Sequence, residues 1–210
     1  MNNRYPLDLI VLVPGKDEKE TIDALLTDRQ KSLGIRKIAF EIKVHPRRDP
    51  GCRTEAPDIL QPYINRAAYA LVIFDHEGCG REESSAQEVA DELKIKLAKK
   101  GWHERNNVLV IEPELEAWVW NNSPHVDEVL GWTGRRPNLR SWLANESFWP
   151  DKELKPPRPK EALKRVLYET RTHFSASIFR QLAQDVSLEG CRDRVFNELK
   201  TTFKTWFSAE

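Results

Sequence analysis

The segment YALVIFDHEG, residues 69–78, indicates the fold class, because it is a continuous apolar run that ends abruptly in two acids and a glycine. Such runs of branched and aromatic residues are typical of parallel-sheet strands that are buried on both faces. Similar runs begin LDLIVLVPG (7–15) and NNVLVIEPELEAWVW (106–120), and IRKIAFEIKVHP (35–46) alternates more cleanly, as a strand near a sheet edge does. The sequence therefore predicts an open parallel sheet of about four strands.

Helical patterns separate these strands. DEKETIDALLTDRQKSL (17–33) and SSAQEVADELKIKLAKKG (84–101) have apolar residues on one face, and a short helix is expected over 56–65. We also expect the fourth strand to run straight into a helix at Pro113. This β-α alternation is typical of an α/β fold with helices flanking the sheet. Helical patterns dominate the rest, which predicts an α/β domain over 1–122 and a helical extension packed on it over 123–210.

Length and composition exclude several classes of protein. The 210 residues suffice for one domain with an appended subdomain, and the 40% hydrophobic content excludes disorder as the default state. A membrane span is not expected, because the longest apolar run, Leu7 to Val13, contains Asp8 and is too short. The N-terminus lacks the pattern of a secretory signal, and the three cysteines are widely spaced. A cytoplasmic location is the resulting expectation.

Acidic residues follow the ends of the predicted strands, where working residues gather in open α/β sheets. We take Asp75, Glu77, Glu112 and Glu114 as candidate catalytic residues. Asp75, Glu77 and Glu112 are the candidate metal ligands, because clustered carboxylate oxygens favour Mg²⁺ or Mn²⁺ over zinc. The alternative for Asp75 and Glu77 is a turn and a capping interaction at the next helix.

Charge is balanced overall, with 33 basic and 33 acidic side chains, but it is unevenly distributed. Residues 75–120 contain eleven acids and six bases, whereas residues 134–173 contain five acids and ten bases. The basic stretch and the first strand-to-helix turn offer candidate contacts to DNA or RNA. These candidates are Lys16, Arg135, Arg136, Arg140 and Lys160. Solvated helix faces would give the same charge counts, and that alternative stays open.

The segments LVPGKDEKETIDALL, LVIFDHEGCG and VLVIEPELEAWVW, in this order, resemble the topoisomerase-primase (TOPRIM) fold of small proteins related to the overcoming-lysogenisation-defect (OLD) nucleases. That family has a Glu-Gly pair after its first strand and an Asp-x-Asp pair after its third, which together hold catalytic magnesium. Asp75 and Glu77 match the second motif, with Glu in place of the second Asp. The first motif is broken, because Pro14 stands where the Glu would precede Gly15.

Four further segments carry a narrower likeness. FDHEGCGREESS, EPELEAWVWNNSPHVDEVLGW, KPPRPKEAL and QLAQDVSLEGC are together similar to the small TOPRIM-like component of bacterial methylation-associated phage-defence systems. The likeness implies an antiviral role beside other defence-system proteins, without fixing the reaction.

Two functions follow from these resemblances. The first is a Mg²⁺-dependent nuclease that acts on nucleic-acid phosphodiesters. The second is a catalytically degenerate module that binds nucleic acid or a partner defence protein, which Pro14 favours because proline cannot bind a metal or act as a base. A nuclease would have to use another carboxylate; Glu18 and Glu20 are in the next helix, where acids more often complement the helix dipole.

Overall fold

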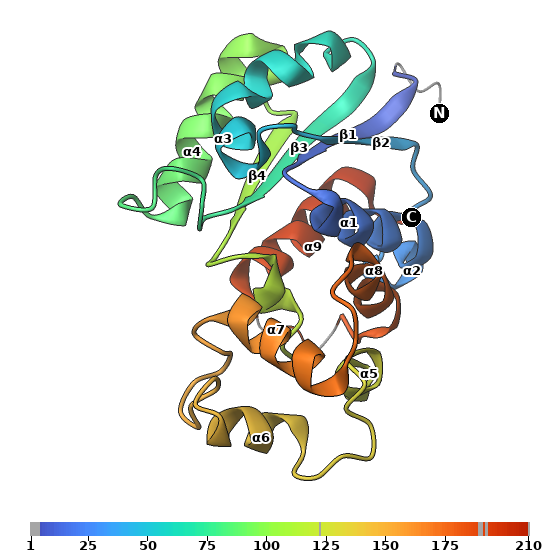
Figure 1. Cartoon of the computed structure of the whole chain (residues 1–210). Coiled ribbons are helices and arrows are strands. Elements are labelled where there is room, and N and C mark those ends of the chain that lie inside the picture. The colour runs from blue at the N-terminus through green and yellow to red at the C-terminus, as the bar shows by residue number, and fades with distance from the viewer. Residues whose placement is uncertain (1–4, 122, 189–190, 192, 210) are drawn as a thin grey trace.

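The computed structural model describes residues 5–121, 123–188, 191 and 193–209, and it is built on a four-stranded sheet (Figure 1). The strands are β1 (Leu7–Val13), β2 (Phe40–Val44), β3 (Ala67–Asp75) and β4 (Asn106–Ile111). Their order is β2-β1-β3-β4 and every neighbouring pair is parallel. The predicted open parallel sheet is confirmed, and β2 lies at an edge, as its alternation indicated.

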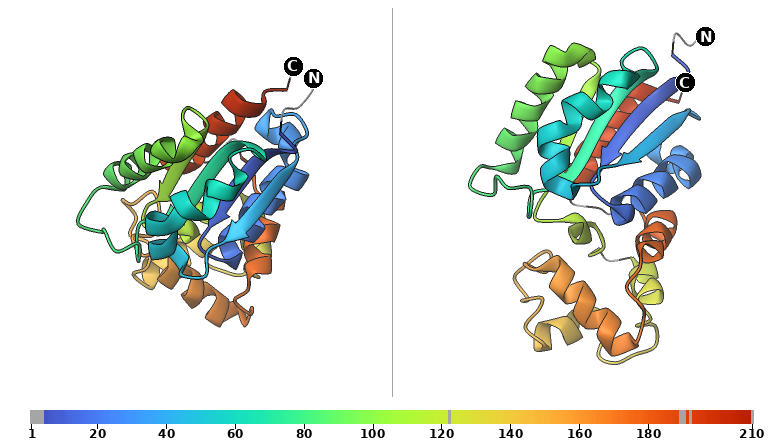
Figure 2. Two further views of the ribbon diagram at one scale, coloured as in Figure 1. Left: turned by 90° about the horizontal axis from the view of Figure 1, so that it is seen from above. Right: turned by 45° about the horizontal axis from the view of Figure 1, so that its top comes forward.

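Helices cover both faces of this sheet (Figure 2). On one face, α3 (Arg48–Leu60) and α4 (Ala86–Leu97) pack on Ile10 and Leu12 of β1 and their neighbours. On the other, α1 (Lys16–Asp28), the short α2 (Gln30–Leu33) and α9 (Arg194–Phe207) cover Leu9 and Val11. Successive strand residues are therefore buried on opposite faces, which explains the continuous apolar runs.

The C-terminal portion is helical, as predicted. It contains α5 (Pro124–Val129), α6 (Leu139–Asn145), α7 (Pro159–Thr170), α8 (Ala176–Asp185) and α9. The first three lie beyond the carboxyl ends of the strands, whereas α8 packs on α1 and α9 returns to the sheet (Figure 1). Arg180 of α8 pairs with Glu20 and Asp23 of α1 at 3.0 and 2.7 Å. The predicted domain boundary at residue 122 falls outside the described residues.

Two expectations about helices were wrong. The helix expected over 56–65 begins eight residues earlier, at Arg48, because Pro50 lies in its first turn, where no backbone donor is needed; the turn η1 (Gln61–Tyr63) follows it. The chain after β4 does not become helical at Pro113 either. Glu114 is extended (φ −160°, ψ 167°), and only a short 3₁₀ turn, η3 (Leu115–Trp118), follows. This extended residue proves central to the site.

Aromatic side chains pack between the C-terminal portion and the rest of the fold. Trp120 packs edge-on against Trp149 with ring centroids 5.6 Å apart, and Trp118 does the same with Phe196 at 5.1 Å. Trp102, in the turn η2 (Ala98–Trp102) after α4, is fully buried. Within the described residues, the helices are too short or too polar to cross a bilayer.

Candidate metal centre

Asp75 is the last residue of β3, at the edge where all four strands end. Its Cα pairs with that of Ile111, the last residue of β4. The Asp75 backbone N–H donates to Oδ1 of Asp49, in the first turn of α3, at 3.0 Å. Asp75 is 7% exposed, and its Oδ1 is buried with no hydrogen-bond partner among the described residues. A buried carboxylate oxygen without a donor is costly unless a cation or a proton satisfies it.

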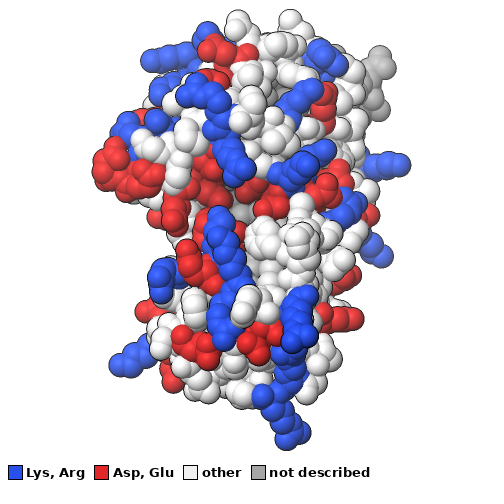
Figure 3. Space-filling model, in the orientation of Figure 1, with Lys and Arg blue, Asp and Glu red and all other residues white. Residues whose placement is uncertain are grey.

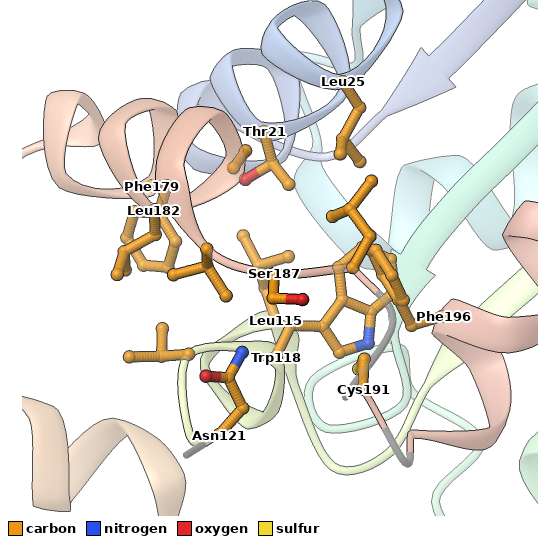
Figure 4. Close-up of a pocket in the computed structure, with 14 residues that line it drawn as sticks. Thr21, Leu25, Leu115, Trp118, Asn121, Phe179, Leu182, Ser187, Cys191 and Phe196 are labelled. Atoms are coloured by element: carbon orange, nitrogen blue, oxygen red, sulfur yellow. The ribbon is translucent and has the colours of Figure 1, made fainter. Parts of the chain in front are cut away.

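Glu114 and Glu116 are brought to Asp75 by Leu115 between them. Leu115 is buried and lines an apolar pocket of about 50 Å³. Figure 4 shows that pocket, with Leu115 beside Trp118 and with Phe179, Leu182 and Phe196 around it. Because Leu115 anchors the chain here, the carboxylates on either side of it have fixed positions.

Asp75, Glu114 and Glu116 form one cluster. All three are buried, and each offers a carboxylate oxygen within 4.8 Å of the others. Three carboxylates at this spacing repel one another unless a cation lies among them. Hard oxygen donors of this kind suit Mg²⁺, Mn²⁺ or Ca²⁺, so the cluster can hold a divalent ion.

The cluster borders a cleft of about 670 Å³ between the sheet edge and α7. Figure 3 shows acidic side chains gathered in the hollow between the two parts of the molecule, with basic side chains around them. The acidic residues that line the cleft are Asp17, Glu18, Asp49, Asp75 and Glu116. The basic residues that line it are Lys16, Arg48, Lys160 and Lys164. Acids in the interior and bases at the rim are the arrangement expected around a metal and a polyanion.

Burial raises the pKa values of the acids in this cleft. The pKa of Asp75 lies well above its ordinary value, because burial and the charges of Glu18 and Asp49 disfavour the ionised form. Burial raises the pKa of Glu116 to about 7 despite the opposing charge of Lys160. Glu18 also has a pKa of about 7, chiefly because of burial and secondarily because of neighbouring acids. Glu18 and Glu116 therefore change charge near neutral pH unless a cation holds them ionised.

Glu18 reaches the cleft from the first turn of α1, and Gly15 provides the space for it. Glu18 is 8% exposed. A Cβ at position 15 would lie 2.8 Å from Oε2 of Glu18, so only glycine leaves the carboxylate where it is. Pro14, which precedes them, lines the same cleft. A carboxylate is thus present beside the broken first motif, three residues beyond Gly15.

The two remaining acidic candidates do not join the cluster. Glu77 is exposed, because β3 ends at Asp75 and the chain turns at Gly78, which has a φ of 84°. Glu112 follows β4 directly, and its side chain is 52% exposed and 3.3 Å from Arg194. His76, between the two acids of the motif, has Nε2 2.8 Å from the Ser84 carbonyl oxygen. The alternation that would place residues 75 and 77 on one side ends with the strand.

The basic candidates also divide into two sets. Lys16 and Lys160 line the cleft. Arg135, Arg136 and Arg140 do not line it. Arg140 stacks over Trp149 at 4.0 Å and donates to three backbone carbonyls, the nearest being that of Glu153 at 2.9 Å. Its guanidinium therefore has a structural role, whereas nucleic-acid binding by this set stays a prediction.

Several site residues were not candidates from the sequence. Glu116 ends the acidic segment EPELE (112–116) but was not among the candidates, and the position of Glu18 in a first helical turn favours a helix-dipole role. The spacing Gly15-x-x-Glu18 was the available signal for Glu18. Asp49 and Arg48 gave none, because their position depends on where α3 begins and on the hydrogen bond to Asp75.

The fold is similar to solved structures of C-terminal regions of OLD proteins. That of Xanthomonas campestris pv. campestris aligns with a TM-score of 0.49 and 15% identity over 94% of each chain. That of Burkholderia pseudomallei aligns with a TM-score of 0.47 and 12% identity over 95% of this chain and 98% of its own. The likeness is one of fold. No protein-family model and no curated protein matches the sequence.

Proposed function

We propose that this protein is a Mg²⁺- or Mn²⁺-dependent nuclease of a phage-defence system, acting in the cytoplasm on DNA or RNA phosphodiesters. The observation that carries the proposal is the buried cluster of Asp75, Glu114 and Glu116 with one unsatisfied Asp75 oxygen, in a cleft lined by bases. The donor set fits the ion, because all of its donors are carboxylate oxygens. One of these oxygens, Asp75 Oδ1, has no hydrogen-bond partner among the described residues.

Asp75, Glu114 and Glu116 would hold the metal. A divalent ion supplies Lewis acidity, which offsets the charge that develops on phosphate oxygens during hydrolysis. Asp75, Glu114 and Glu116 are all buried, so little bulk solvent reaches them. The buried acids therefore act in a medium where charge interactions are stronger than in water.

Glu18 would act as the general base. It lines the cleft with Asp75 and Glu116, and its pKa of about 7 suits proton transfer at neutral pH. Its carboxylate would accept the proton of the attacking water. This role supplies the base that Pro14 cannot, and it supports catalysis over the alternative of a degenerate module.

Lys16, Arg48 and Lys164 would bind the phosphates that flank the scissile bond. All three are exposed side chains at the cleft. Their positive charges attract a polyanion to the cleft. Without a metal ion, the acidic interior of the cleft would repel the same polyanion. Binding of the nucleic acid therefore requires both the metal ion and these three basic side chains.

The test is a cleavage assay with labelled single-stranded DNA, double-stranded DNA and RNA, in Mg²⁺, Mn²⁺ or EDTA. We expect cleavage that EDTA abolishes and that falls by about 100-fold or more in Glu18→Gln and Glu116→Gln variants. Metal-independent binding of an oligonucleotide without cleavage, unchanged in both variants, would instead support the binding module.

A further inference from the structure

Lys160 holds two of the three acids of the cluster. It is in the first turn of α7, and its Nζ lies 2.8 Å from Oε2 of Glu114 and 3.6 Å from Oε1 of Glu116. Its backbone N–H also donates to Oε1 of Glu114 at 3.1 Å. Both oxygens of Glu114 are therefore bound by one residue of the C-terminal helical portion.

The surroundings keep the Lys160 side chain charged. Burial lowers its pKa, but the hydrogen bond to Glu114 and the charges of Glu116, Glu114 and Asp75 raise it, and the net pKa lies above its ordinary value. The side chain is 38% exposed, so it lies between the cluster and the open cleft. A single positive charge thus offsets part of the repulsion among the buried acids.

We infer that Lys160 is the resident counter-ion of this cluster, and that a divalent ion must displace its ammonium from Glu114 and Glu116 in order to bind. The inference rests on the metal site of the proposed function. Magnesium requires carboxylate oxygens at about 2.1 Å, so it competes directly for oxygens that the ammonium now holds. Two cations side by side also repel each other, which favours one occupant at a time.

The backbone contact explains how the exchange can occur without undocking α7. The N–H of Lys160 holds Oε1 of Glu114, and Pro159 accepts a hydrogen bond from Trp120 Nε1 at 3.2 Å. Neither contact uses the ammonium. The side chain can therefore swing into the cleft while the helix and Glu114 keep their positions.

The experiment measures Mn²⁺ affinity, by calorimetry and by electron paramagnetic resonance, for wild type, Lys160→Met and a control, Lys152→Met. Lys152 is exposed and does not line the cleft. Removing the competing ammonium should tighten Mn²⁺ binding by about tenfold or more at pH 8, whereas the control should stay within about twofold of wild type. Equal affinity in wild type and Lys160→Met would overturn the inference while leaving the metal site intact. No Mn²⁺ binding by either protein would overturn the metal site as well.

A second measurement uses the wild-type protein, so that it does not depend on the folding of a variant. Lysine acetylation by a water-soluble active ester is followed by mass spectrometry with Mn²⁺ and with EDTA. Mn²⁺ should accelerate modification of Lys160 several-fold, because the released ammonium is freer to react, and should leave the exposed Lys99 unchanged. Equal rates at Lys160 with and without Mn²⁺ would contradict displacement.

Discussion

The acids after β3 and β4 differ in what fixes them. Asp75 ends a buried strand and Glu116 follows the anchored Leu115, and both point to the cleft. Glu77 and Glu112 are only a few residues away, yet one lies in a turn and the other pairs with Arg194 at the surface. A carboxylate is held in the interior only where apolar neighbours fix its backbone, since its own charge favours water. Burial, rather than distance along the chain, therefore separates the acids of the cluster from the surface acids.

The largest expected effect on cleavage comes from replacing a buried carboxylate by an amide, with the same replacement at a surface acid as the comparison. Asp75→Asn should lower metal-dependent cleavage by about 100-fold or more, because it removes a ligand from a three-carboxylate set. Glu77→Gln should change the rate by less than about twofold. Rates are measured under single-turnover conditions at saturating Mn²⁺. Equal losses in the two variants would mean that burial does not distinguish the acids.

The pH dependence should follow the buried acids. Glu18 and Glu116 have pKa values of about 7. Each is raised by burial, so protonation at lower pH removes a base or a ligand, and cleavage at sub-saturating Mn²⁺ should fall by about tenfold or more per pH unit below 7. In Glu18→Gln, the residual cleavage rate should fall less steeply as the pH is lowered below 7. A flat profile between pH 5.5 and 8 would exclude both roles.

A smaller effect is expected from Gly15→Ala. The new methyl group would lie 2.8 Å from Oε2 of Glu18, and the flexible carboxylate should move aside at little cost in stability. Cleavage should fall several-fold with little change in the melting temperature. In a Glu18→Gln background the same substitution should add nothing, because the two residues act through one contact. Additive losses would show that Gly15 matters for another reason.

The smallest effect should distinguish the two basic surfaces. For binding of a single-stranded oligonucleotide, each lost phosphate contact flattens the salt dependence by roughly 0.7 units of slope. Lys16→Ala with Lys164→Ala should flatten it more than Arg135→Ala with Arg136→Ala, because only the lysines line the cleft. The reverse order would move the nucleic-acid path to the surface around the arginines.

Much of this fold follows from local sequence. The apolar runs predicted all four strands, and the strand-end rule pointed to Asp75 and Glu114. What local patterns did not give depends on tertiary contacts. Glu77 has the spacing of a ligand, but the strand ends before it, and Asp49 reaches the site only because α3 begins at Arg48.

The central claim is that burial of Asp75 is tolerated because a divalent ion binds there, and thermal unfolding at pH 8 tests it most directly. A carboxyl whose folded-state pKa is raised stabilises the fold at acid pH, and this contribution is lost as the pH rises through that pKa. The Asp75→Asn variant should not lose stability in this way, because its amide does not ionise. Without metal, Asp75→Asn should therefore melt higher than wild type at pH 8, by a margin that shrinks towards pH 5.

Added Mn²⁺ should then raise the melting temperature of wild type by several degrees, through binding to the folded state alone, and leave Asp75→Asn unchanged. A variant that is less stable than wild type without metal, and that gains as much from Mn²⁺, would contradict the account.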